Sequence, residues 1–143
     1  MMTTRAQLSE SAEHEGGHTE LMRAALEGRT NDVRTLLTSK VDVNAKDDEG
    51  RTALMFAVTN MKTDCVDLLL SHGADVNATA NDGSTALMLG ASVGDSGIVR
   101  VLLSKGAHLS GKFIETGKTA LTLAREREYT EIVELLKAAG AEQ

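Results

Sequence analysis

The chain repeats one short pattern four times, and this repeat limits the possible folds more than any other feature of the sequence. The block Gly50–Met55, GRTALM, returns as Gly83–Met88, GSTALM, after 33 residues and as Gly117–Thr122, GKTALT, after a further 34. A degenerate copy, Gly17–Met22, precedes them. Self-similarity at a fixed period predicts a repeat protein, in which each copy buries its apolar face against the next copy.

Each copy of the pattern predicts two short helices. Thr52, Thr85 and Thr119 follow a glycine and precede an apolar segment, where a hydroxyl can cap the free N–H groups of a helix start. A second block, such as Val66–Leu70, VDLLL, has apolar residues at i, i+3 and i+4 and ends near a glycine such as Gly73. Because isolated helices shorter than ~12 residues are unstable in water, stacking must stabilise these helices.

A third block completes the unit, since Asp42–Ala45, DVNA, recurs as Asp75–Ala78. With these three blocks in a constant order, residues 17–141 resemble the ankyrin repeat. The resemblance implies an all-α helical repeat solenoid of stacked helix-turn-helix units joined by hairpin-like loops. We expect a flexible lead-in over 1–16 and an ankyrin repeat domain over 17–143, with units of about 17–46, 47–79, 80–112 and 113–143.

The helix starts depart from the family pattern. The family favours proline after the capping threonine, and this chain has Ala53, Ala86 and Ala120 there. The family favours histidine two residues later, and this chain has Met55, Met88 and Thr122. The hydrogen bonds with which that histidine braces the loops are therefore expected to be missing.

Composition and charge exclude several classes of function. Fifteen Lys and Arg against 21 Asp and Glu give a net charge of −6, which repels nucleic acid. No apolar run reaches the ~20 residues that span a bilayer or, in the first part of the chain, the ~7 to 15 of a secretory signal. The single cysteine, Cys65, excludes an internal disulfide. We expect a soluble, cytoplasmic and monomeric protein that binds neither nucleic acid nor membrane.

With one Tyr, two Phe and no Trp, the core must consist of Leu, Ala, Val and Met. We assign Met55, Met88 and Phe56 to this core. We also expect the thiol of Cys65 to be packed. No His or basic flank near Cys65 in sequence favours a reactive thiolate.

Two short motifs could carry chemistry. His14–His18, HEGGH, fits the letters of a zinc hydrolase motif, so a metal-dependent hydrolase using His14 and His18 is an alternative from another class. Its two adjacent glycines disfavour the helix that such a site needs, and no third ligand is evident. Gly117–Thr119 lacks the spacing of a phosphate-binding loop. We expect no catalytic residue, no metal and no cofactor.

The resemblance implies a non-catalytic protein–protein interaction module that binds through loop tips and the inner helical face. The loop-tip positions are Asp48, Glu49, Arg51, Asn81, Asp82, Ser84, Phe113, Ile114, Glu115 and Lys118. The positions on the inner helices are Thr59, Asn60, Ser92 and Val93. An alternative is a stoichiometric inhibitor or adaptor of one enzyme. The partner itself is not encoded in any pattern.

Two features of these loops leave alternatives open. Asp47, Asp48 and Glu49 form an acidic tip that either steers a basic partner or is a solvated loop. Phe113 and Ile114 lie at or beside an extra residue in the third loop. They are either an exposed apolar anchor, for a partner or for self-association, or they fold back onto the last unit.

Overall fold

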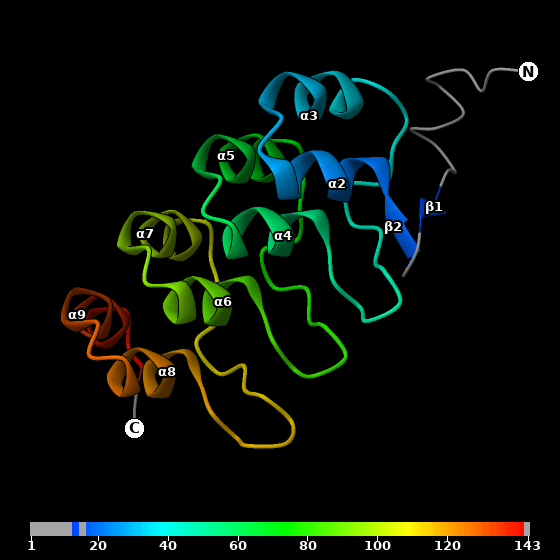
Figure 1. Cartoon of the computed structure of the whole chain (residues 1–143). Coiled ribbons are helices and arrows are strands. Elements are labelled where there is room, and N and C mark those ends of the chain that lie inside the picture. The colour runs from blue at the N-terminus through cyan, green and yellow to red at the C-terminus, as the bar shows by residue number, and fades with distance from the viewer. Residues whose placement is uncertain (1–12, 15–16, 142–143) are drawn as a thin grey trace, which may run out of the picture. The chain divides into compact units, whose positions relative to one another are not determined.

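The structure is a computed structural model that describes residues 13–14 and 17–141. The described residues form eight helices and two strands of two residues each, which confirms the predicted all-α repeat fold (Figure 1). Contacts along the backbone divide the chain into an N-terminal unit, Met1–Asp75, and a C-terminal unit, Val76–Gln143. Each unit contains two helix pairs.

In the N-terminal unit the two helix pairs pack on each other, so that α2 contacts α4 and α3 contacts α5. The elements are β1 (Glu13–His14), β2 (His18–Thr19), α2 (Glu20–Glu27), α3 (Thr30–Leu37), α4 (Ala53–Thr59) and α5 (Thr63–Ser71). The strands β1 and β2 are antiparallel, a short ladder that the sequence does not predict. The rest of the predicted lead-in over 1–16 lies outside the described residues.

The C-terminal unit repeats this arrangement, with α6 against α8 and α7 against α9. Its helices are α6 (Ala86–Val93), α7 (Ser96–Ser104), α8 (Ala120–Glu126) and α9 (Thr130–Ala138). An isolated bridge between Lys112 and Thr119 closes the loop before α8. Across the described residues, no helix has both the length and the apolar character needed to cross a bilayer.

Threonine begins the first helix of every pair, as the repeat predicts. At Thr19, Thr52, Thr85 and Thr119 the side-chain oxygen accepts the backbone N–H three residues later over 3.2–3.4 Å. At the first of these caps, Sδ of Met22 also accepts the N–H of Thr19 at 3.4 Å. A cap of this kind contributes about 1 kcal/mol to stability.

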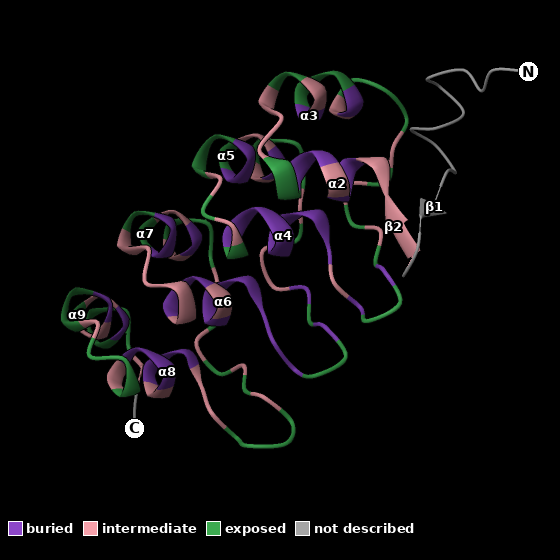
Figure 2. Ribbon diagram, viewed as in Figure 1, coloured by how far each residue is buried: buried purple, intermediate pink, exposed green. Residues whose placement is uncertain are grey.

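The core of each unit consists of the small and aliphatic side chains that the composition predicts. Leu69 in the N-terminal unit and Leu102 in the C-terminal unit are fully buried. Met55, Met88 and Phe56 are also buried, which confirms their assignment to the core. Figure 2 shows that α4 and α6, the first helices of their pairs, are buried over most of their length.

Asparagine side chains connect the loops of successive repeats. Asn44 donates through Nδ2 to the carbonyl of Gly73 at 3.2 Å, and its Oδ1 accepts the N–H of Asp75 at 2.7 Å. Asn77 makes the same two contacts in the C-terminal unit, with residues 29 and 31 positions later. The asparagine of the DVNA block thus satisfies backbone groups in the turns that follow the second helices α5 and α7.

Candidate protein-binding surface

Three hairpin-like loops precede α4, α6 and α8 and carry most of the side chains predicted to contact a partner. In each loop the N–H of the first residue donates to the carbonyl of the last over 2.9–3.0 Å. The pairs are Asp47 with Arg51, Ala80 with Ser84 and Phe113 with Lys118. Asp47, Ala80 and Phe113 therefore occupy equivalent positions.

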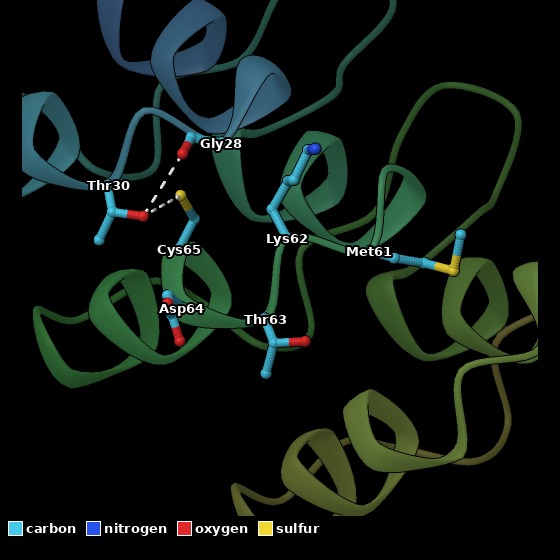
Figure 3. Close-up of a pocket in the computed structure, with 7 residues that line it drawn as sticks. All are labelled: Gly28, Thr30, Met61, Lys62, Thr63, Asp64 and Cys65. Atoms are coloured by element: carbon cyan, nitrogen blue, oxygen red, sulfur yellow. Dashed lines mark hydrogen bonds between the residues drawn. The ribbon is translucent and has the colours of Figure 1, made fainter.

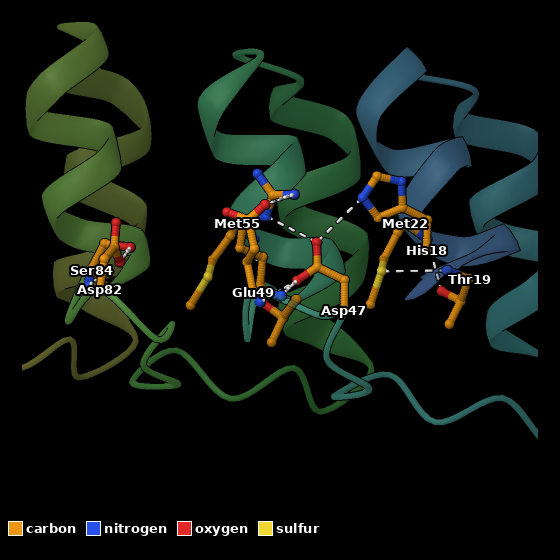
Figure 4. Close-up of polar contacts among 10 residues, drawn as sticks. His18, Thr19, Met22, Asp47, Glu49, Met55, Asp82 and Ser84 are labelled. Carbon is orange, nitrogen blue, oxygen red and sulfur yellow. Dashed lines mark hydrogen bonds and ion pairs between the residues drawn. The ribbon is translucent and has the colours of Figure 1, made fainter. Parts of the chain in front are cut away.

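Asp47 braces the first loop from within (Figure 4). Its Oδ1 accepts the N–H groups of Glu49 and Arg51 at 2.9 and 2.8 Å, and its Oδ2 accepts Nε of Arg51 at 2.9 Å. The side chain of Asp47 is fully buried, so including it in an exposed acidic tip was wrong. Asp48 and Glu49 are exposed, and Glu49 lies 3.5 Å from Nη2 of Arg51.

The pKa of Asp47 lies below its ordinary value. Burial acts to raise the pKa. The hydrogen bonds from the backbone and side chain of Arg51 and from the N–H of Glu49 lower the pKa, as does the charge of Arg51. Together these interactions outweigh the effect of burial. This carboxylate supplies loop bracing of the kind expected to be lost with the family's histidine. The sequence signal for this bracing role is the position of Asp47, two and four residues before the N–H groups that its side chain accepts.

His18 also packs against this loop. Its Nε2 is 3.3 Å from Oδ2 of Asp47, although Nε2 is buried and forms no hydrogen bond. The imidazole contacts the edge of Phe56 with ring centres 5.3 Å apart, and the guanidinium of Arg51 lies 4.9 Å from the centre of the same ring. The side chain of His18 thus packs β2 against the first loop.

The hydrolase alternative requires both histidines of HEGGH on one helix, and the backbone is not arranged that way. His14 lies in β1 and pairs with His18 in β2 across an antiparallel ladder. The side chain of His14 lies outside the described residues. Within the described part of the chain, no three His, Cys, Asp or Glu side chains gather to hold a metal ion.

In the second loop, Asp82 and Ser84 hold each other in place. Oδ1 of Asp82 accepts the N–H of Ser84 at 2.9 Å and its hydroxyl at 2.6 Å. Ser84 is only 4% exposed, so its side chain stabilises the loop and does not face a partner, contrary to the prediction. Asn81 and Asp82 are exposed at the tip, as predicted.

The third loop contains the extra residue. The carbonyl of Phe113 accepts the N–H of Gly117 at 2.8 Å, and three residues lie between them. In the first loop the equivalent bond joins Gly50 to Asp47, with two residues between them. Ile114 is 74% exposed, while Phe113 and Lys118 are half-buried and Glu115 is exposed. The two residues of the Phe113–Ile114 pair therefore differ in exposure, because Ile114 is exposed to solvent and Phe113 is half-buried.

The positions predicted on the inner helices lie at the C-terminal ends of α4 and α6. Thr59 is exposed, whereas Asn60, Ser92 and Val93 are half-buried. Nδ2 of Asn60 donates to the carbonyl of Phe56 at 3.3 Å, so this amide helps to end α4. Thr59 is the most accessible of these four positions.

Cys65 lies at a cavity of about 300 Å³ in the N-terminal unit (Figure 3). The residue is fully buried, and its Sγ is 4.0 Å from Oγ1 of Thr30. Burial raises the pKa of the Cys65 thiol above its ordinary value. The thiol is packed, as predicted.

Comparison with known proteins agrees with this geometry. A family model described as ankyrin repeats (three copies) matches residues 21–112 and 80–143. No curated protein gives a significant match to the chain. Ankyrin repeats are in general protein–protein interaction modules. The helix pairs, the capping threonines and the family match together show that this chain belongs to the ankyrin repeat family.

Proposed function

We propose that this chain binds another protein without catalysing a reaction, through its hairpin-like loops and the accessible ends of the inner helices. The observation that carries the proposal is Ile114, whose side chain is 74% exposed. Apolar surface in water is unfavourable and becomes favourable when a partner covers it. The general role of the family in protein interaction supports the same conclusion.

The backbone around Ile114 is braced by the loop before it. The N–H of Ile114 donates to the carbonyl of Asp82 at 2.9 Å. Gly83 has a φ of 92°, and a Cβ there would lie 2.3 Å from the carbonyl oxygen of Lys112. These two loops therefore pack backbone to backbone, a contact that only glycine permits. An ordered loop loses little conformational entropy on binding, which supports its role as a contact surface.

The proposed contact residues are the predicted ones without Ser84, which is buried. They are Asp48, Glu49, Arg51, Asn81, Asp82, Phe113, Ile114, Glu115, Lys118, Thr59, Asn60, Ser92 and Val93. The proposal places this binding in a reducing compartment such as the cytoplasm, and the free, buried Cys65 supports that setting.

The test compares three immobilised proteins in a cell extract of the source organism: wild type, Ile114→Glu and Thr35→Glu. Thr35 is the control, because it is exposed and lies on α3, the second helix of its pair, outside the proposed contact residues. A charge at the centre of an interface costs ~1.4 kcal/mol or more. We expect Ile114→Glu to retain about tenfold less of a partner identified by mass spectrometry, and Thr35→Glu to retain it fully.

Thermal unfolding of both variants provides the control for folding. If Ile114→Glu retains the partner as well as the wild type does, the third loop is not the contact. If the wild type retains no protein above background, the binding proposal itself fails.

A further inference from the structure

A cavity of about 370 Å³ opens beside Ile114 in the C-terminal unit. It is lined by Asp82, Phe113, Glu115, Thr116, Lys118 and Leu123. Leu123 is buried and Phe113 is half-buried, so these two side chains form an apolar floor. Asp82, Glu115 and Thr116 are exposed and form the rim. Leu123, on α8, was not among the predicted contact residues.

The charges around this cavity do not balance. Nζ of Lys118 is 3.0 Å from Oε1 of Glu126, so the positive charge of Lys118 is already paired. Asp82 uses Oδ1 for its bonds to Ser84. Among the described residues, no cation forms an ion pair with Asp82 or Glu115. Two carboxylates therefore remain uncompensated above an apolar floor.

We propose that this cavity receives an arginine or lysine side chain of the partner protein. Such side chains lay their methylene stem on apolar surface and keep the charged group in polar surroundings. Here the stem lies on Phe113 and Leu123, and the cation lies between Asp82 and Glu115. Ile114, next to the cavity, then contacts an apolar residue beside the basic one. The inference rests on the proposed function, because it names the chemistry of the partner at one of its contact loops.

The probe is the blocked tetrapeptide acetyl-GLRG-amide, titrated into the ¹⁵N-labelled full chain and followed by NMR. We expect saturable shifts of the backbone amides of residues 113–118 and of Leu123. The peptide acetyl-GLEG-amide, which reverses the charge, should bind about fivefold more weakly or worse, since exposed charge pairs each contribute modestly.

Variants of the chain locate the recognition. The double substitution Asp82→Asn, Glu115→Gln removes both uncompensated carboxylates with little change of shape and should weaken binding of the arginine peptide about fivefold. Glu126→Gln releases Lys118 and should weaken it as well. Asp64→Asn, Asp67→Asn removes the same charge from exposed positions on α5, in the N-terminal unit and outside the proposed contact residues, and should leave the affinity unchanged.

The inference is overturned if the amides of residues 113–118 do not shift, if the glutamate peptide binds equally well, or if the Asp82, Glu115 double variant keeps wild-type affinity. The two proposals fail separately. An extract partner that depends on Ile114, without any peptide binding at the cavity, leaves the proposed function standing and overturns the basic-residue inference. Peptide binding at the cavity without any extract partner upholds the inference and overturns the proposed function.

Discussion

Asp47 shows how one buried carboxylate can organise a loop. It accepts two backbone N–H groups and the guanidinium of Arg51, while its side chain has no contact with solvent. The equivalent positions in the other loops are Ala80 and Phe113, which have no carboxylate to offer. At this position of the loop, the buried carboxylate of Asp47 therefore has no equivalent in the other two loops.

A pH dependence of stability follows from this carboxylate. Because the pKa of Asp47 is lower in the folded chain, the unfolded chain binds the proton first as the pH falls. The contribution of Asp47 is complete above about pH 4 and is lost as the pH falls through the folded-state value. The melting temperature of the wild type should thus fall more steeply below about pH 4 than that of Asp47→Asn.

Circular dichroism melts over this pH range check the prediction. Asp67→Asn, at an exposed position on α5, is the control and should keep the slope of the wild type. A wild-type slope in Asp47→Asn would show that the buried carboxylate has no such role.

At the scale of single residues, the sequence predicts caps better than exposure. Thr52, Thr85 and Thr119 were predicted from local spacing, because a cap depends on residues within one helical turn. The burial of Asp47 depends on His18 and on the rest of its loop, which local spacing does not describe. For the same reason the sequence left Phe113 and Ile114 open, and only the folded loop separates them.

The helix α6 contains a glycine where its equivalents have none. Gly90 is buried in the interior of α6, and a Cβ there would lie 3.4–3.7 Å from side-chain atoms of Ile98, Val99 and Leu102 on α7. These are ordinary contact distances, so α6 can accommodate a methyl group. Gly90 therefore makes α6 less stable than an alanine at this position would, although the packing leaves room for the alanine methyl group.

Gly90→Ala should stabilise the chain by about 1 kcal/mol, because alanine loses less conformational entropy than glycine in a helix. In a chain of this size the melting temperature should rise by roughly 3 °C. Gly94→Ala is the matched control at the end of the same helix. Its φ is 83° and its Cβ would lie 2.7 Å from the ring of Tyr129, so it should destabilise. Differential scanning calorimetry decides, and a lower melting temperature for Gly90→Ala contradicts the argument.

At the scale of elements, the sequence predicts the helices and misses the strands. The helix pairs follow from apolar periodicity, threonine caps and terminal glycines, signals that are repeated in several copies. The strands β1 and β2 have two residues each, too few to show any periodicity. Their pairing was therefore not predictable, and it places His14 and His18 on two strands where the zinc motif needs one helix.

At the scale of the whole molecule, few large apolar side chains are exposed in the part of the chain that the structure describes. Among the described residues, the large apolar side chains that are exposed are Leu26 and Met61 in the N-terminal unit and Ile114 in the C-terminal unit. The net charge is −6, which opposes association of like molecules. A stable homodimer generally needs a contiguous apolar interface much larger than one side chain.

Sedimentation equilibrium should therefore give a mass of 15.2 kDa that does not change with protein concentration. Ile114→Glu should have the same mass as the wild type. A mass that rises with concentration in the wild type, and returns to the monomer value in Ile114→Glu, would instead identify self-association as the role of the third loop.

The third loop also shows how such a molecule can change over evolutionary time. It holds one residue more than the first loop, yet the hydrogen bond at its base, from the N–H of Phe113 to the carbonyl of Lys118, is 3.0 Å long, against 2.9 Å in the first loop. Insertions at the tip are thus separated from the helices that determine folding. Natural variation in loop length can accumulate there while the inherited scaffold stays intact.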